Sequence, residues 1–212
     1  MNSGSSRMAA ATGAFYIVAI IAGEQLMAAD STIVARAGYG LAVLGFTAFV
    51  VFVAYLHPVL RAAEGPGGWL ATLALSAGLL HSAIRFGGQA PRIIGQYRAD
   101  ALSPELARIL EDLNGAAFVV TGLLLGLYCA AAGRLCLAHG IGPRWLAWFG
   151  TVSGLLAVPA SVVGMADPDL YAPVAFLAGL IWTLILSVVL TVRPQPVVHG
   201  SASPAGTAAP AR

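Results

Sequence analysis

Six long stretches of the chain consist mostly of apolar residues, and short polar or turn-forming segments separate them. A helix that crosses the hydrocarbon core of a bilayer needs about 20 such residues. Each stretch reaches about that length, so the pattern predicts an all-α fold, a polytopic membrane bundle of six transmembrane helices. The predicted helices cover residues 9–29, 35–56, 68–90, 113–137, 144–166 and 171–192.

The two ends of the chain differ from this central part. Residues 1–8 are polar, and a charge followed by an apolar run is also typical of a signal peptide. The run that follows is about 20 residues long and contains Glu24, so we interpret it as a first helix that the protein retains. Residues 193–212 are rich in Pro, Ala, Ser and Gly without periodicity, which predicts a disordered tail. One transmembrane domain, residues 9–192, lies between them.

The composition agrees with a membrane location, because 58% of the residues are hydrophobic and only 9% are charged. Soluble domains contain about 25% charged residues, whereas a protein solvated by lipid tails needs few. The eleven basic residues are all arginines, and the net charge of +2 is too small and too scattered for a nucleic-acid-binding surface. Membrane lipid is therefore the expected partner, and no nucleic acid is expected.

The positive-inside rule predicts the orientation of the bundle. With the N-terminus in the cytoplasm, the inner segments hold six arginines and the outer segments hold four. Trp69, Trp145 and Trp148 then lie at inner helix ends, where interfacial tryptophans are common. We expect insertion in the inner, cytoplasmic membrane with both termini in the cytoplasm.

One connection, residues 91–112, is longer and more charged than the others. It contains a typical helix start, with Ser103 as the N-cap, proline at the first helical position and an acid in the first turn. Apolar residues then recur at helical spacing. The pattern predicts that the fourth helix begins early, as an amphipathic extension whose charges form a solvated face with local pairs such as Arg108 and Glu111.

Small residues mark the faces through which helices approach each other in lipid, where no hydrophobic drive favours association. Such faces are Gly38, Ala42 and Gly45 on the second helix, Gly115, Gly122, Gly126 and Gly133 on the fourth, and Gly179, Thr183 and Ser187 on the sixth. We expect them to pack within the chain. The GxxxG pattern of the fourth helix also allows a homo-oligomer.

Ionisable residues inside a membrane are costly, and they mark candidate functional sites. Glu24 lies near the end of the first helix, and His81, Arg85 and Gln89 recur at four-residue spacing on the third. Asn114 opens the fourth helix. Because successive helices alternate in direction, these residues, apart from His81, are expected at similar depth in one half of the bilayer.

The simplest interpretation of this cluster is an ion pair between Glu24 and Arg85, hydrogen-bonded to Gln89 and Asn114, since an unpaired charge at this depth is expensive. The cluster is then either a structural clasp that fixes helix register or a pocket for a small ligand. In a pocket, Arg85 would bind an anionic group. Glu24 or His81 would transfer protons as catalytic residues.

His81 is more typical of a hydrogen-bonded helix residue than of a metal ligand. His57 and His139 are expected at the opposite side of the membrane, so neither can join His81 on a haem. The sequence also contains no phosphate-binding glycine loop and no paired-cysteine motif. We therefore expect no metal and no cofactor.

Three stretches of the chain resemble a family of uncharacterised bacterial membrane proteins that is catalogued as a domain of unknown function and is common in actinobacteria. They are the third helix with its histidine, arginine and glutamine at four-residue spacing, SPELARILEDLNGAAFVV at residues 103–120, and GPRWL at residues 142–146. The resemblance implies six helices and a membrane location. It implies no particular reaction.

Three functions remain open at this point. The first is a multi-pass membrane protein of unknown molecular function whose polar cluster is a clasp or a small-ligand pocket. The second is a membrane-embedded biosynthetic enzyme for a lipophilic, isoprenoid-type substrate, such as a terpene cyclase with Glu24 as its acid. The candidate ligand-binding residues are Gln89, Asn114, Tyr16 and Trp182. In a cyclase, the aromatic rings of Tyr16 and Trp182 would stabilise cations. The third is a small transporter, although the two halves of the chain lack the convincing similarity expected of inverted repeats.

Overall fold

The computed structural model describes residues 3–29, 31–98, 101–167 and 173–193. Within these ranges the chain forms six α-helices and no strand, and all six are long and apolar enough to cross a membrane. The predicted all-α bundle is therefore confirmed. The helices are α1 (Ser3–Met27), α2 (Thr32–Glu64), α3 (Leu70–Tyr97), α4 (Pro104–His139), α5 (Arg144–Ala166) and α6 (Val174–Val192). Apart from Arg193, the predicted disordered tail lies outside the described residues.

Several helices extend beyond their predicted boundaries. α2 continues through Pro58, and α3 continues through Pro91 to Tyr97. Proline lacks a backbone N–H and usually interrupts a helix, which is why the sequence predicted that the third helix ends before Pro91. Residues 91–112 are therefore mostly helical rather than one long loop, and the connection between α3 and α4 covers only residues 98–103.

The start of α4 confirms that the fourth helix begins early. Ser103 is the N-cap, and its Oγ accepts a hydrogen bond from Leu106 N at 3.3 Å. With 36 residues, α4 is about 54 Å long, whereas the hydrocarbon core is about 30 Å thick. α4 is therefore longer than the hydrocarbon is thick, and the charges of its first turns (Glu105, Arg108, Glu111 and Asp112) lead us to expect the excess at this end. The predicted pair of Arg108 and Glu111 is wrong, because no ion pair joins them in the described part of the chain.

The turn between α2 and α3 is closed by a side-chain cap. Glu64 Oε1 accepts a hydrogen bond from Leu70 N at 2.7 Å, and Oε2 accepts one from Ala71 N at 3.0 Å. Arg61 lies 3.9 Å from the same carboxylate and donates to the carbonyl of Gly68. A carboxylate at a helix N-terminus satisfies free N–H groups and interacts favourably with the helix dipole. This cap fixes the hairpin of α2 and α3 at one end of the bundle.

Glycines let two pairs of helices touch along their backbones. Between α1 and α2, a Cβ atom on Gly38 would lie 2.7 Å from Gly23 O. Between α4 and α5, a Cβ atom on Gly154 would lie 2.5 Å from Gly126 O. The predicted small-residue faces of the second and fourth helices therefore pack within the chain. Gly115 does not take part, because no described atom lies within 4 Å of a Cβ atom built there.

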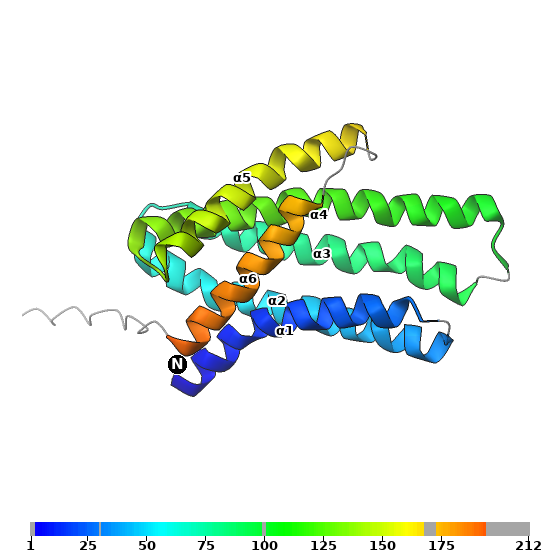
Figure 1. Cartoon of the computed structure of the whole chain (residues 1–212), viewed down its shortest axis with the longest axis horizontal. Coiled ribbons are helices and arrows are strands. Elements are labelled where there is room, and N and C mark those ends of the chain that lie inside the picture. Colours follow the sequence, from blue (N-terminus) through cyan, green and yellow to red (C-terminus); the bar gives the residue numbers. More distant parts are fainter. Residues whose placement is uncertain (1–2, 30, 99–100, 168–172, 194–212) are drawn as a thin grey trace, which may run out of the picture.

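The small-residue face of α6 contains the point where this helix crosses α1. Ser187 Oγ donates to Ala10 O at 2.6 Å and accepts from Ala14 N at 2.8 Å. In a regular helix the N–H of Ala14 would donate to the carbonyl of Ala10. The Ser187 hydroxyl is instead inserted between these two backbone groups of α1. An inserted side chain bends a helix. Figure 1 shows α1 changing direction near its start, where the oblique α6 crosses it.

Candidate functional site

A cavity of about 480 Å³ lies between α1, α4 and α6, and α2 and α3 also contribute to its lining. Figure 1 shows that α1 and α3 finish and α4 begins at the same end of the bundle, and lining residues come from the later turns of α1 and α3 and from residues 114 and 118 of α4. We call this cavity the amphipathic cavity. Its apolar and aromatic wall consists of Tyr16, Ile20, Ile21, Phe46, Phe118, Phe176, Leu177 and Leu180. Its polar side consists of Glu24, Gln25, Arg85, Arg92 and Asn114.

Glu24 of α1 joins two arginines of α3 at this cavity. Arg92 Nη1 donates to both oxygens of the Glu24 carboxylate, at 3.2 Å and 3.0 Å. Arg85 Nη2 lies 3.8 Å from Glu24 Oε1, which is an ion-pair distance but too long for a hydrogen bond. The predicted pair of Glu24 and Arg85 is present, but Arg92 is the closer partner. Two positive and one negative formal charge give the cluster a net charge of +1.

Arg92 is the residue of this cluster that the sequence reasoning missed. It follows Arg85 by seven residues, a spacing that places both side chains on one face of a helix. This signal exists only if the helix continues through Pro91, where the sequence predicted its end. In the structure α3 continues to Tyr97, and both guanidinium groups therefore meet Glu24.

Arg85 is the most deeply buried charge of the cluster. Its side chain is 7% exposed, against 32% for Arg92 and 38% for Glu24. Its guanidinium lies 5.6 Å from the ring centroid of Phe46 and 5.4 Å from that of Phe118, so cation–π contacts partly replace water. This guanidinium donates no hydrogen bond to a described residue. Arg85 therefore brings N–H donors to the cavity that a ligand can use.

Gln89 and Asn114 do not form the hydrogen bonds that the sequence predicted. Gln89 is 2% exposed, and neither its amide oxygen nor its amide nitrogen has a partner among the described residues. Asn114 lines the cavity, and its Oδ1 is also buried and without a partner in the described chain. The prediction that both amides bond to the ion pair is wrong. Buried amide groups in this state are uncommon in proteins.

His81 is hydrogen-bonded through both ring nitrogens. Nδ1 lies 3.1 Å from Thr121 O, and Nε2 lies 3.2 Å from the hydroxyl of Tyr16. A carbonyl oxygen only accepts hydrogen bonds, so Nδ1 carries the proton, and Nε2 of the neutral ring accepts from Tyr16. His81 has no exposed surface, whereas Tyr16 lines the cavity. Of the two hydrogen bonds of His81, the one to Tyr16 therefore leads to a cavity-lining residue.

The described residues contain no group of three or more His, Cys, Asp or Glu side chains placed to hold a metal ion. Both ring nitrogens of His81 already have protein partners. The cavity instead offers both charged groups and apolar rings among its lining residues, a combination suited to an amphiphilic organic molecule.

Trp182, which the sequence proposed as a ligand-binding residue, lies away from the cavity. Its Nε1 donates to Leu146 O at 2.9 Å, and its ring packs edge-on against Tyr128 with centroids 5.7 Å apart. A Cβ atom on Gly150 would collide with the indole. Trp182 has no exposed surface and does not line the cavity. It belongs to the core between α4, α5 and α6.

The chain belongs to a family described as a domain of unknown function, DUF4386, whose family model matches residues 11–193. This confirms the uncharacterised family that the sequence resembles. No curated protein and no solved structure matches the chain. The matched range includes every residue that lines the amphipathic cavity, so the cavity lies within the family domain.

Proposed function

We propose that this DUF4386 protein holds a lipophilic molecule with an anionic head group in its amphipathic cavity, within the membrane. The observation that carries the proposal is the guanidinium of Arg85, which is buried at the cavity and donates no hydrogen bond to a described residue. Burying such a donor without an acceptor is costly. An oxyanion of a ligand supplies the acceptor and the opposite charge.

The charge balance of the cavity favours an anion. Glu24 neutralises one of the two guanidinium groups, and a formal charge of +1 remains on the cluster. Phe46 and Phe118, which also line the cavity, lie beside the Arg85 guanidinium and exclude water there. Coulombic attraction is stronger where water is excluded, so an anionic head group gains most beside Arg85.

The apolar lining residues favour an apolar tail. Phe118 and Phe176 meet edge to face with ring centroids 4.8 Å apart, and Leu180 lines the cavity beside them. The volume of about 480 Å³ lies within the usual range of ligand pockets, about 300 to 1,000 Å³. An amphiphile with a charged head and a hydrocarbon tail matches both kinds of lining residue.

Two lining residues indicate how such a molecule enters. Ile21 of α1 is 57% exposed, and Leu177 of α6 is 51% exposed, although both line the cavity. In a transmembrane bundle, exposed apolar side chains face lipid tails. The cavity therefore opens sideways between α1 and α6, and a membrane-dissolved ligand enters it without crossing water.

The structural clasp is the second candidate, and the bond between Arg92 and Glu24 favours it. This charged hydrogen-bonded contact, at 3.0 Å to one carboxylate oxygen, links α1 to α3. A clasp and a pocket differ in what they require of Arg85. A clasp needs Arg92 and Glu24 for stability, whereas a pocket needs Arg85 for binding.

A terpene-cyclase role has less support from these contacts. Such an enzyme would use Glu24 as a proton donor, but Glu24 accepts hydrogen bonds from Arg92. Tyr16 does line the cavity, as an aromatic residue of a cyclase would, whereas Trp182 lies outside it. Proton transfer in this cavity would therefore need another donor.

Binding of dodecyl phosphate tests the proposal. Purified protein in dodecyl maltoside is titrated with dodecyl phosphate, and with dodecanol as the uncharged reference, and the affinity is measured by isothermal titration calorimetry. We expect dodecyl phosphate to bind more tightly than dodecanol. Arg85→Met removes charged hydrogen bonds worth about 1.5 to 3 kcal/mol, so its affinity for dodecyl phosphate should fall about 10- to 150-fold.

Arg134→Met is the matched control, because it makes the same substitution at an exposed arginine of α4 that does not line the cavity. Melting temperature and size-exclusion profile are recorded for both variants, so that a folding defect is separated from a binding defect. Equal affinity of wild type and a folded Arg85→Met variant would contradict the proposal. A large loss of stability with unchanged affinity in Arg92→Met would favour the clasp alone.

A further inference from the structure

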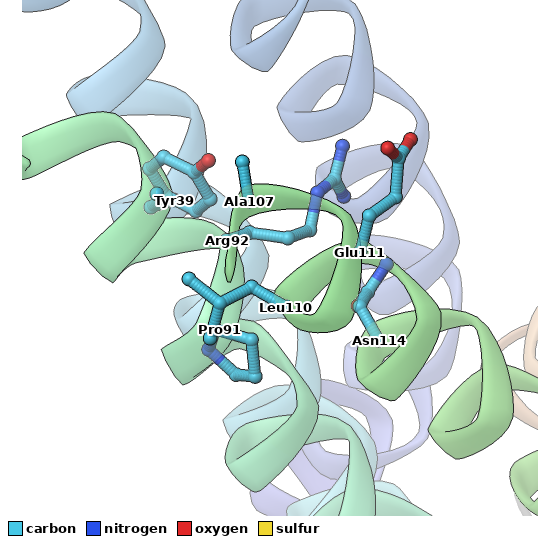
Figure 2. Close-up of a pocket in the computed structure, with 8 residues that line it drawn as sticks. Tyr39, Pro91, Arg92, Ala107, Leu110, Glu111 and Asn114 are labelled. Atoms are coloured by element: carbon cyan, nitrogen blue, oxygen red, sulfur yellow. The ribbon is translucent and has the colours of Figure 1, made fainter. Parts of the chain in front are cut away.

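A second, smaller pocket of about 290 Å³ lies between α2, α3 and α4. We call it the polar pocket, and its polar lining residues are Tyr39, Arg92, Glu111 and Asn114. Figure 2 shows Arg92 extending from α3 toward Glu111 and Asn114 of α4, with Tyr39 across from them. The pocket lies at the early turns of α4, which we expect in the zone of lipid head groups because α4 is longer than the hydrocarbon is thick and these turns are charged.

The polar pocket and the amphipathic cavity are neighbours. Arg92 and Asn114 line both of them. Glu24 lines only the amphipathic cavity, and Glu111 lines only the polar pocket. An anionic group bound at Arg92 therefore has an apolar cavity on one side and an acidic, hydrogen-bonding pocket on the other.

Two acceptors in the polar pocket lack a donor from the described chain. Asn114 Oδ1 is buried and has no hydrogen-bond partner there. Glu111 is exposed and forms no ion pair with a described residue. An amide oxygen and a carboxylate only accept hydrogen bonds, so a ligand that fills this pocket is favoured if it carries N–H or O–H donors.

We propose that the polar pocket is a head-group site and that the ligand carries a hydrogen-bond donor beyond its anionic group, as in a phosphodiester with an ammonium or hydroxyl substituent. This inference rests on the proposed function, because it assigns the outer part of the same amphiphile. The anionic group lies at the two arginines, Arg85 and Arg92, the donor faces Glu111 and Asn114 Oδ1, and the tail occupies the amphipathic cavity. Formal charges of opposite sign on Arg92 and Glu111 match this order of groups.

A series of probes with one tail and different head groups tests the inference. Dodecyl phosphate, dodecylphosphocholine, dodecylphosphoethanolamine and dodecylphosphoglycerol are titrated into the full-length protein in dodecyl maltoside micelles. The choline head has no donor, the ethanolamine head has an ammonium, and the glycerol head has hydroxyl groups. We expect the ethanolamine or glycerol compound to bind about tenfold more tightly than the choline compound. Tighter binding of the ethanolamine compound than of the glycerol compound indicates an ammonium site. Equal binding of these two compounds indicates that hydroxyl donors suffice.

Glu111→Gln is the informative variant, because Glu111 is exposed and its amide analogue has nearly the same shape. We expect the preference for donor-bearing head groups, taken as the ratio of their affinities to that of the choline compound in the same variant, to fall to about threefold or less. Glu105→Gln is the control, since Glu105 lies in the first turn of the same helix and does not line the polar pocket. It should keep the preference of the wild type.

The two proposals fail in different ways. If dodecyl phosphate binds in an Arg85-dependent manner but the four head groups bind equally, the head-group site is wrong and the proposed function stands. If the preference exists but survives in Glu111→Gln, the assignment to the polar pocket is wrong. If dodecyl phosphate binds no better than dodecanol and Arg85→Met has no effect, both proposals are wrong.

Discussion

The helices α4 and α5 are held together by close backbone contact, whereas α1 and α3 are held together by charged side chains across a space. At the first, glycines remove side chains, so that a Cβ atom on Gly133 would lie 2.6 Å from Thr151 N. At the second, long charged side chains span the distance, with Glu24 facing Arg85 and Arg92. The first interface leaves no room, whereas a cavity of about 480 Å³ accompanies the second.

The difference shows how a membrane protein separates scaffold from site. Lipid provides no hydrophobic drive between helices, so they associate through close packing or through polar contacts. Close packing fixes the backbones and excludes ligands. Polar contacts between separated helices preserve both volume and charge, which are what a binding site needs. Small-residue faces therefore mark the scaffold, and a polar cluster without such a face marks the candidate site.

The largest expected effect is at the scaffold. Gly154→Ala places a methyl group against backbone atoms of Gly126 and Ala130, and backbone cannot move aside as a flexible side chain can. We expect a loss of about 3 kcal/mol or more in stability, seen as a low yield of monodisperse protein in detergent. Gly115→Ala makes the same change where no described atom is within 4 Å, and it should be neutral. Similar yields of both variants would show that the close contact between α4 and α5 is not what holds the bundle together.

A smaller and more specific effect is expected from Glu24→Gln. The carboxylate is 38% exposed, so solvent screening limits its contribution to stability to about 1 kcal/mol. Its removal leaves both guanidinium groups free to bind an anion. We therefore expect a lower melting temperature together with a several-fold tighter affinity for dodecyl phosphate. A folded variant that binds dodecyl phosphate more weakly than wild type would argue against an anion site at these arginines.

Trp182→Phe tests whether Trp182 contributes to the stability of the core or to ligand binding in the cavity. The variant loses the hydrogen bond from Nε1 to Leu146 O, which contributes about 1 kcal/mol to stability. The affinity for dodecyl phosphate should not change, because Trp182 does not line the cavity. Thermal unfolding and the same titration measure both quantities. A marked loss of affinity at unchanged stability would show that the indole contacts the ligand.

The smallest effect is expected from Ser187→Ala at the crossing of α1 and α6. Hydrogen bonds between transmembrane helices contribute about 0.6 kcal/mol on average. After the substitution, the freed groups of Ala10 and Ala14 can pair with each other in the regular helix pattern. The melting temperature should fall only slightly. A loss as large as that of Gly154→Ala would show that the inserted hydroxyl is essential to the bundle.

The helices were predictable because membrane spans have a strong, one-dimensional signature. The ends of the helices were less predictable, and the error that mattered most was to end the third helix before Pro91. Proline disfavours a helix interior locally, but α3 continues past it. A sequence alone cannot weigh that local cost against the contacts that the continued helix makes. The omission of Arg92 from the predicted cluster followed from this single boundary.

The candidate site was predictable in outline but not in its contacts. Intramembrane charges pointed to Glu24 and Arg85, and these two residues do meet. Whether Gln89 and Asn114 reach the ion pair depends on how each helix is rotated about its axis. Residue spacing does not define that rotation closely enough. Trp182 illustrates the same limit, because its place on α6 gave no sign that it faces α5 rather than the cavity.

The most direct test of an amphiphile in the cavity is photo-labelling with a diazirine-bearing dodecyl phosphate, followed by mass spectrometry of the labelled peptides. Our account predicts labelling around Phe118 of α4 and around Phe176 and Leu180 of α6, abolished by excess unmodified dodecyl phosphate. α5 contributes no lining residue and serves as the internal reference. Labelling that is spread over lipid-facing residues of α5 and resists competition would contradict the account.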